Sequence, residues 1–346
     1  MEFERLSQGV AKEVFASNGT TVSRRSVWTF LVLLCVLSWP VWLASGVLPR
    51  AGTGGYDARW LVAQAGVMGP SLAALLVSGS LSRALRWNSL CLLPFVLGPL
   101  VVPGILVAHA SPGQVSQLPL LPAVAAVAVA ALVVLFLSPL NSRLLGPATG
   151  TPQARPPVSV VLLSLTLFPA LFLLAWAFAS AQGGHFEIAA LQAGPLGSAW
   201  ILLVCFAHNL LLGGSLGEEL GWRGFLLPAL LRESSPLGAS LVLAVVGGLW
   251  HLPIDLYAGF GIAGPGAILV RIVFLVPVSI LFTWFYLRSK GSLLVAILLH
   301  TSVNVMSDLG LSSYETAAIM FGLLTGVAAA VLSGLSSVFR RNASAS

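Results

Sequence analysis

Charged residues are scarce in this sequence. Its 346 residues include 17 Lys and Arg and 11 Asp and Glu, so that 8% of the chain is charged, whereas a soluble domain usually carries about 25%. These side chains are too few to cover the surface of a water-soluble protein of 36.0 kDa. The scarcity therefore excludes an ordinary cytosolic domain, and it also excludes a disordered chain or a coiled coil.

Cysteine is almost as scarce. The chain has three, Cys35, Cys91 and Cys205, and each lies in an apolar run. Three cysteines cannot form the framework of a disulfide-stabilised secreted domain. We interpret them as small buried hydrophobic residues.

Apolar residues are abundant instead. They make up 57% of the chain, and the mean hydropathy is +0.96. A transmembrane helix needs about 20 mostly apolar residues, and the sequence contains roughly ten such stretches. It therefore predicts an all-α, polytopic transmembrane helix bundle of about 8–10 helices, with a polar site within the membrane. The predicted spans are 26–48, 61–80, 89–109, 118–139, 158–182, 197–231, 237–256, 267–287, 291–307 and 316–338.

Basic residues are distributed unevenly between the two sides of this predicted bundle. Thirteen of the 17 fall in the two tails and in alternate loops, while Arg50 and Arg59 fall on the opposite side. Cytoplasmic loops of membrane proteins carry an excess of Lys and Arg. The bias predicts a multi-pass integral protein of the plasma or inner membrane, with both termini in the cytoplasm.

The loops between the spans are short, so no separate soluble domain is expected. A stretch rich in Pro and Gly at 145–157 is the best candidate for a linker between two parts of the membrane domain. The predicted organisation is a cytoplasmic tail at 1–25, variable N-terminal helices at 26–157, a core at 158–338 that carries the chemistry, and a C-terminal tail at 339–346.

Ionisable residues within predicted spans mark the candidate site. Each costs about 2.5–3.5 kcal/mol on insertion scales, so such residues are functional hypotheses by default. They are concentrated in 208–304, and the N-terminal 190 residues offer almost nothing comparable. The ionisable residues are His208, Glu218, Glu219, Arg223, His251, Asp255, Arg271 and His300, and the polar Asn304 is grouped with them.

Residue counting brings four of these side chains to one level. Glu218 lies 17 residues before the turn near Ser235 and His251 lies 16 after it, so an antiparallel hairpin places both about 24–26 Å from the turn. His300 and Asn304 follow the turn near Ser289–Lys290 by about 15–21 Å and share a helix face, as do Glu219 and Arg223. We therefore expect three helices to place Glu218, His251, His300 and Asn304 at a similar depth in the membrane.

Small residues favour close packing at this level. Gly213, Gly217 and Gly221 are spaced four apart on one predicted helix, and Gly247 and Gly248 lie one turn before the histidine of the next. Two further features are interpreted as structural. His208 is expected two to three turns from Glu219 on a similar face, and Arg271 is expected to pair with Asp255 near the far interface.

Two carboxylates, two histidines and an amide suit the activation of water. A buried carboxylate can act as a general base, and a histidine can share the water with it. A second histidine and an amide can donate hydrogen bonds to an oxyanion. No Ser or Cys is clearly partnered with a base, so covalent catalysis is not favoured. Glu and His ligands could also form a zinc site, but no His-Glu-x-x-His helix is present.

The segment Gly217–Pro228 resembles the CPBP family, which comprises CAAX prenyl proteases of type II and proteins of bacteriocin processing or immunity. The family motif Glu-Glu-x-x-x-Arg matches Glu218, Glu219 and Arg223. The second motif, Phe-x-x-x-His, is matched in His251, with Gly247 at the Phe position. The third, His-x-x-x-Asn, is matched by His300 and Asn304. The resemblance covers roughly 199–308.

The resemblance implies an intramembrane endopeptidase whose catalytic set is Glu218, Glu219, Arg223, His251, His300 and Asn304. By likeness, Glu218 and His251 activate a water, His300 and Asn304 form the oxyanion site, and Glu219 with Arg223 holds the arrangement. The missing Phe bears on the packing of the helix that carries His251, where Trp250 can supply the bulk.

The implied partners are a membrane-anchored or lipidated peptide substrate and the lipid bilayer, with no nucleic acid. No cofactor is expected, although the family's past description as metalloproteases leaves zinc open. Two alternatives from other classes stay open. One is a non-catalytic scaffold or a protein of the bacteriocin-immunity type, and the other is a transporter. A transporter should show paired broken helices in two related halves, whereas polarity here is confined to one half.

Overall fold

The computed structural model describes residues 22–48, 58–78, 156–183, 194–211, 214–258, 266–309 and 315–335. Within these ranges the regular structure is helical and contains no strand, which agrees with the all-α prediction. Two short segments are π-helices, η3 and η4. The elements are α2 (Arg24–Val47), α3 (Ala58–Gly66), α4 (Gly69–Val77), α10 (Val158–Ala181), α12 (Gly194–Leu211), α13 (Ser215–Gly221), η3 (Trp222–Leu226), α14 (Leu227–Glu233), α15 (Pro236–Trp250), η4 (Ile254–Ala258), α16 (Ala267–Arg288), α17 (Leu293–Asp308) and α18 (Glu315–Leu335).

Six predicted spans agree closely with observed helices, namely α2, α10, α15, α16, α17 and α18. The predicted spans 89–109 and 118–139 lie outside the described residues, as do Cys91 and most of the proposed linker. Of the described cysteines, Cys205 is buried and Cys35 half-buried, and both are free thiols.

Two predicted spans are wrong as single helices. The span 197–231 divides into α12 and a second helical segment formed by α13, η3 and α14. Gly214, which lies between the two, has φ of 103°, a left-handed conformation that ends a right-handed helix. The span 61–80 divides into α3 and α4 at a turn after Gly66, with Pro70 in the first turn of α4. Hydropathy does not reveal either break, because the residues around it are apolar.

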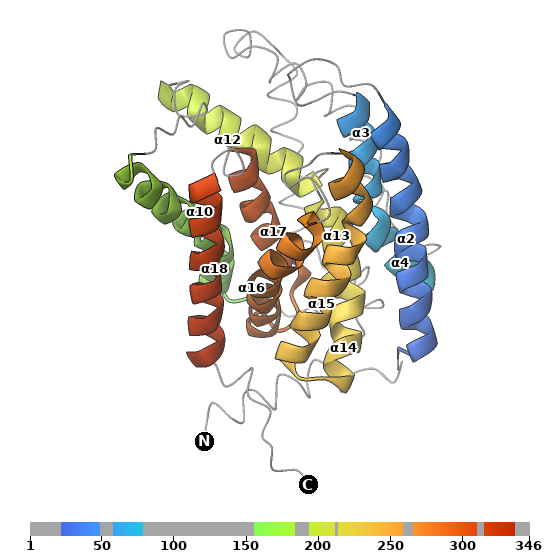
Figure 1. The fold of residues 1–346 in the computed structure, drawn as a ribbon. Coiled ribbons are helices and arrows are strands. Elements are labelled where there is room, and N and C mark those ends of the chain that lie inside the picture. Colours follow the sequence, from blue (N-terminus) through green and yellow to red (C-terminus); the bar gives the residue numbers. More distant parts are fainter. Residues whose placement is uncertain are drawn as a thin grey trace, which may run out of the picture.

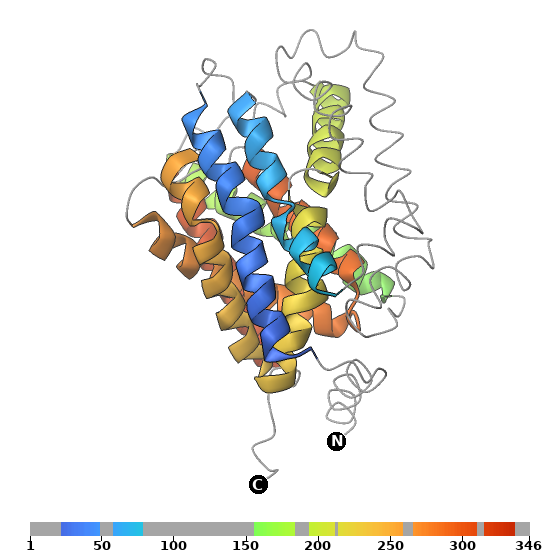
Figure 2. The ribbon, with the colours of Figure 1, turned by 90° about the vertical axis from the view of Figure 1, so that its right-hand side faces the viewer.

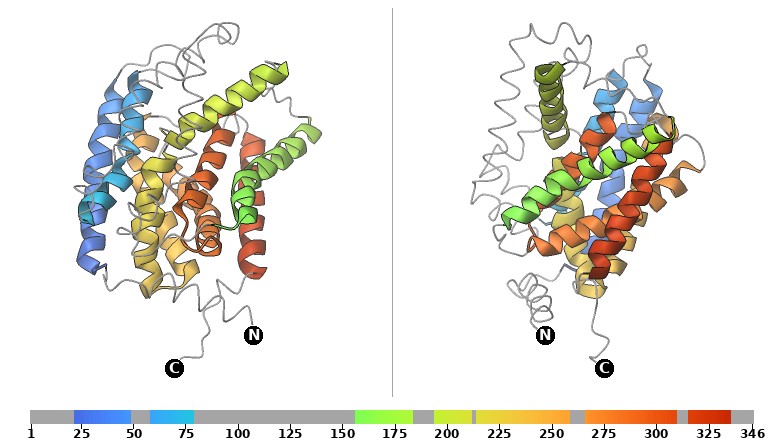
Figure 3. Two further views of the ribbon diagram at one scale, coloured as in Figure 1. Left: turned by 180° about the vertical axis from the view of Figure 1, so that it is seen from behind. Right: turned by 90° about the vertical axis from the view of Figure 1, so that its left-hand side faces the viewer.

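The helices surround a central group that carries the motifs (Figure 1). Helix α2 packs against α3 and α4, and α4 packs against α13. Figure 2 shows these three N-terminal helices together on one side of the molecule. Helices α10 and α18 lie on the opposite side, next to α17 and α16 (Figure 3, left). The central group of α13, η3, α14, α15, α16 and α17 is therefore enclosed from both sides.

Helix α2 illustrates how an apolar helix distinguishes its two faces. Phe30 and Leu34 are buried at a spacing of four residues, and Trp42 follows on the same face. Trp28 and Val32 lie on the other face with 68% and 60% of their surface exposed. In a membrane bundle, large apolar side chains that are exposed at helical spacing form the face of the helix that contacts lipid.

Three described helices are long and apolar enough to cross a membrane by length and composition: Arg24–Val47, Val158–Ala181 and Ile268–Arg288. Pro40, Pro169 and Pro277 lie inside these helices. Interior prolines are tolerated in membrane helices because neighbouring groups satisfy the freed backbone carbonyls. The fold is thus a helical bundle of an integral membrane protein.

The predicted role of small residues holds for the part of the glycine series that the structure describes, although the partner helix was not predicted. A Cβ on Gly221 would lie 2.5 Å from the Pro70 backbone oxygen, and one on Gly217 would lie 3.0 Å from the Val67 oxygen. Both glycines therefore face α4 or the turn before it. Gly248 likewise faces Ile272 of α16. Gly213 lies outside the described residues.

Candidate active site

The Glu-Glu-x-x-x-Arg motif lies on a continuous helical segment formed by α13, η3 and α14. Glu218 and Glu219 are in α13, and Arg223 is in the π-helical turn that follows. All three side chains are buried, with exposures of 7%, 0% and 7%. Wide turns of this kind occur mostly inside α-helices and often at functional sites.

Glu219 is the centre of a buried polar network. Its Oε1 accepts a hydrogen bond from Arg223 Nη1 at 2.8 Å and lies 2.7 Å from His300 Nδ1. An ionised carboxylate only accepts, so Nδ1 of His300 carries the proton of this bond. The guanidinium of Arg223 also lies 4.1 Å above the ring of Phe282. The predicted pairing of Glu219 with Arg223 is confirmed, and the bond to His300 extends it to the third motif.

Glu218 is held in a different way. Its Oε2 accepts a hydrogen bond from Trp222 Nε1 at 3.0 Å, one turn further along the helix. Its Oε1 lies where Gly214 leaves space, because a Cβ on that glycine would come within 2.5 Å of it. Gly214 is thus required twice, for its left-handed backbone and for the room it leaves beside the carboxylate.

His251 follows the last residue of α15. Its Nδ1 lies 2.7 Å from the Gly247 carbonyl oxygen, which can only accept, so this nitrogen is the donor and Nε2 is left as the acceptor. The ring of Trp250 meets the imidazole edge to face at 4.6 Å, and Trp42 of α2 stacks on it at 6.0 Å. The bulk expected of Trp250 is present, and Trp42 adds to it from outside the motif region.

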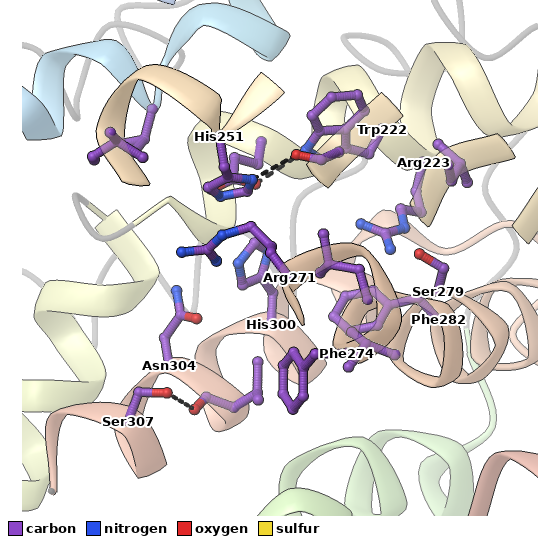
Figure 4. Close-up of a pocket in the computed structure, with 18 of the residues that line it drawn as sticks. Trp222, Arg223, His251, Arg271, Phe274, Ser279, Phe282, His300, Asn304 and Ser307 are labelled. Carbon is purple, nitrogen blue, oxygen red and sulfur yellow. Dashed lines mark hydrogen bonds between the residues drawn. The ribbon is translucent and has the colours of Figure 1, made fainter. Parts of the chain in front are cut away.

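One cavity of about 310 Å³ joins these groups. Five of the six predicted residues line it, and Glu219 lies behind the wall, where it holds Arg223 and His300. In Figure 4, His251, His300 and Asn304 surround the same space, and Arg271 reaches between them. The convergence predicted from residue counting is therefore observed. The lining residues from the motifs are Glu218, Arg223, His251, His300 and Asn304.

The lining residues that the sequence did not assign to the site include Trp42 and Arg271. Trp42 is fully buried and forms part of the cavity wall. Arg271 was interpreted as half of a structural ion pair, and it also lines the cavity. Its unusual position, an arginine within a predicted span, was the available signal. Nothing local marks Trp42, because its contact with His251 spans more than 200 residues of sequence.

The predicted position of His208 relative to Glu219 is wrong, because the break at Gly214 separates their helices. His208 is buried in α12, and its Nδ1 lies 3.8 Å from Asp308 Oδ2 at the end of α17. The neighbouring Asn209 donates from Nδ2 to the same oxygen at 2.7 Å. These contacts tie α12 to α17 one turn beyond Asn304, which is a structural role, as expected.

A metal site is not formed by the described residues. No group of three or more His, Cys, Asp or Glu side chains among them is arranged to hold a metal ion. A catalytic zinc site needs three protein ligands and an open position. In this arrangement Glu219 Oε1 is bonded to Arg223 and His300, and Nδ1 of His251 is bonded to a backbone carbonyl. The described residues therefore present no set of three ligands, and dependence on a metal is a question for a chelator experiment.

Replacement of Trp42 by alanine should lower both stability and activity. The change opens a large void, which typically costs about 3–5 kcal/mol for a buried aromatic residue, and it frees the imidazole of His251 to move. For the peptide cleavage that the sequence resemblance implies, we expect kcat/KM to fall roughly 10–100-fold, as for other small misplacements of a reacting group. Trp28→Ala is the matched control, since Trp28 lies on the same helix with 68% exposure. Equal effects of the two changes would contradict a role for Trp42 in the site.

Comparisons with known proteins agree with the motifs. Residues 195–306 match the family model described as type II CAAX prenyl endopeptidase Rce1-like. The chain is 30% identical over 171 residues to CAAX prenyl protease 2 of Methanococcus maripaludis, an alignment that covers 48% of this chain and 62% of that protein. The chain thus spans less than two thirds of the length of this relative. The resemblance to the CPBP family is confirmed over this region.

Proposed function

From this family relationship over residues 195–306, we propose that the protein is an intramembrane endopeptidase that hydrolyses a peptide bond with a water activated by Glu218 and His251. One observation carries the proposal. The residues of three separate helices that match the family motifs line one cavity, and the sixth motif residue, Glu219, holds two of them by hydrogen bonds.

The first step is the attack of water on the peptide carbonyl. Nε2 of His251 is the acceptor nitrogen of the ring and can orient the water through one of its hydrogens. The carboxylate of Glu218 takes the other proton as the water oxygen bonds to the carbonyl carbon. Trp222 donates to one carboxylate oxygen of Glu218, which leaves the other for the proton.

The second step is the breakdown of the tetrahedral intermediate. Its oxyanion accepts hydrogen bonds from the amide of Asn304 and from Nε2–H of His300 in its imidazolium form, since Nδ1–H of the same ring is bonded to Glu219. Glu218 then gives its proton to the amide nitrogen as the C–N bond breaks, so that an amine and a carboxylic acid form, and the acid passes its remaining proton to the released amine. Arg223 does not react in this scheme and keeps Glu219 in place.

The proposed substrate is a membrane-anchored or lipidated peptide. The apolar helix faces around the cavity indicate a site within the bilayer, which such a peptide can reach by lateral diffusion. The name of the relative, CAAX prenyl protease 2, adds a prenylated C-terminal peptide as the first candidate. We further propose a multi-pass arrangement in the plasma or inner membrane with both termini in the cytoplasm, supported by the distribution of basic residues.

The test is cleavage of an S-farnesyl peptide by the purified protein in liposomes, with products identified by mass spectrometry. Addition of a zinc chelator should leave the rate unchanged, because the described side chains do not form a metal site. A rate that falls with chelator and returns with zinc would contradict the metal-free mechanism. Binding without cleavage would favour the scaffold alternative, and solute flux across the same liposomes would favour a transporter.

A further inference from the structure

The cavity has a charged group that the proposed mechanism does not use. Arg271, near the start of α16, lines the cavity and forms an ion pair with Asp255 of η4. Its Nε donates to Asp255 Oδ2 and its Nη2 donates to Oδ1, each at 2.5 Å. Asp255 is almost fully buried, whereas the side chain of Arg271 keeps 27% of its surface accessible. The acid is thus behind the arginine, which faces the open space.

The geometry of this pair leaves one edge of the guanidinium for a ligand. A guanidinium has five N–H donors in a planar fork. The bonds to Asp255 use the side edge, formed by Nε and Nη2, and leave the end edge, formed by Nη1 and Nη2. An end edge of this kind matches the two oxygens of a carboxylate, and the buried acid fixes its direction. Asp255 is therefore suited to position Arg271.

The wall beside Arg271 is apolar. Phe274, Leu275 and Val278 follow it on the same face of α16, at three, four and seven residues, and all line the cavity. The other arginine of the cavity, Arg223, is already bonded to Glu219. Figure 4 shows Arg271 between His251 and Asn304, so the cation lies beside the groups that are proposed to react. A ligand with an anionic end followed by apolar side chains would complement Arg271 and the apolar wall beside it.

We propose that Arg271 binds the free α-carboxylate at the C-terminus of the peptide substrate, with Asp255 as its positioning residue. The proposal rests on the proposed function and deepens it, because it selects peptides that end shortly after the bond to be cleaved. The apolar wall of α16 then contacts the side chains between that bond and the carboxylate. Arg271 would determine specificity and take no part in the proton transfers.

The test compares two S-farnesyl peptides of one sequence, one with a free C-terminal carboxylate and one with a C-terminal amide. The assay uses phosphatidylcholine liposomes, so that no anionic headgroup competes for Arg271. A charge-assisted bidentate bond predicts that wild type prefers the acid by about 10–100-fold in kcat/KM, mainly through KM. Arg271→Gln should abolish the preference, so that the acid and the amide are cleaved with the same kcat/KM.

Arg288→Gln is the matched control, since Arg288 ends the same helix and does not line the cavity. It should retain the preference for the acid. An unchanged preference in Arg271→Gln would overturn the proposal, as would an equal fall in kcat for both peptides, which would indicate a role at the oxyanion or in folding. Because Arg271→Gln leaves Asp255 buried without its partner, the double variant Asp255→Asn, Arg271→Gln is measured as well.

A binding measurement separates this proposal from the proposed hydrolysis. Fluorescence anisotropy of the two peptides, labelled at the N-terminus, is measured with wild type and with Glu218→Gln. Tighter binding of the acid that depends on Arg271, without any cleavage by wild type, would sustain the carboxylate site and contradict the hydrolysis. Cleavage of both peptides at equal rates, with equal binding, would sustain the hydrolysis and overturn the carboxylate site.

Discussion

Replacement of Glu218 by glutamine should lower kcat for peptide cleavage about 10²–10⁴-fold, the range that a general base contributes. Glutamine has the shape of glutamate, and its carbonyl oxygen can still accept the hydrogen bond from Trp222. It cannot take a proton from water. The change therefore removes one chemical function from the cavity and leaves the packing in place. Single-turnover cleavage of the farnesyl peptide, with the thermal unfolding curve recorded beside it, measures both properties.

The control for Glu218→Gln is Trp222→Phe, which deletes the donor to Glu218 and keeps an aromatic ring in the core. It should cost far less activity than Glu218→Gln, since the base itself remains. If Glu218→Gln retained activity within tenfold of wild type while folding normally, Glu218 would not be the base, and the assignment of the first motif would have to change.

Replacement of Glu219 by alanine should lower the free energy of unfolding by about 3–5 kcal/mol, the usual cost of breaking a buried ion pair. Glu219 is fully buried, and its loss leaves the guanidinium of Arg223 without its partner and His300 without its anchor. Cleavage should fall as well, because the ring of His300 can turn. Denaturant unfolding in mild detergent, followed by tryptophan fluorescence, gives the stability change.

A surface ion pair provides the comparison. Nη2 of Arg24 lies 3.3 Å from Oε2 of Glu233, and the two side chains are 84% and 60% exposed. Exposed pairs contribute little, typically no more than about 1 kcal/mol, so Glu233→Gln should hardly change the unfolding curve. A second variant, Glu219→Gln with Arg223→Met, removes both buried charges and should recover part of the stability lost in Glu219→Ala. Similar losses from Glu219→Ala and Glu233→Gln would contradict the buried network.

Much of the site was accessible from the sequence because membrane helices make polar residues conspicuous. A carboxylate or a histidine within an apolar run is costly to insert into a membrane, so its presence indicates a functional role. Counting residues from the turn at Ser235 was enough to place Glu218 beside His251, since two straight helices joined by a short turn rise at the same rate. The cavity that contains both confirms this placement.

The sequence did not reveal features that depend on contacts between distant segments. The backbone conformation of Gly214 is set by the packing around it, so the run 197–231 appeared as one helix although it forms two. The register between Glu219 and His300 likewise depends on how α13 and α17 pack. The position of Arg271 on the cavity wall follows from the packing of α16 against α15, which no local pattern specifies.

The stacking of Trp42 on His251 has a consequence for how this protein can change over evolutionary time. The family match begins at residue 195, so part of the cavity wall is built from a segment outside it. A transplant of the matched region into another helical protein would carry the reacting groups without the ring that confines the imidazole. Divergence in α2 is therefore coupled to divergence around His251, and the two segments should be exchanged together in any chimera.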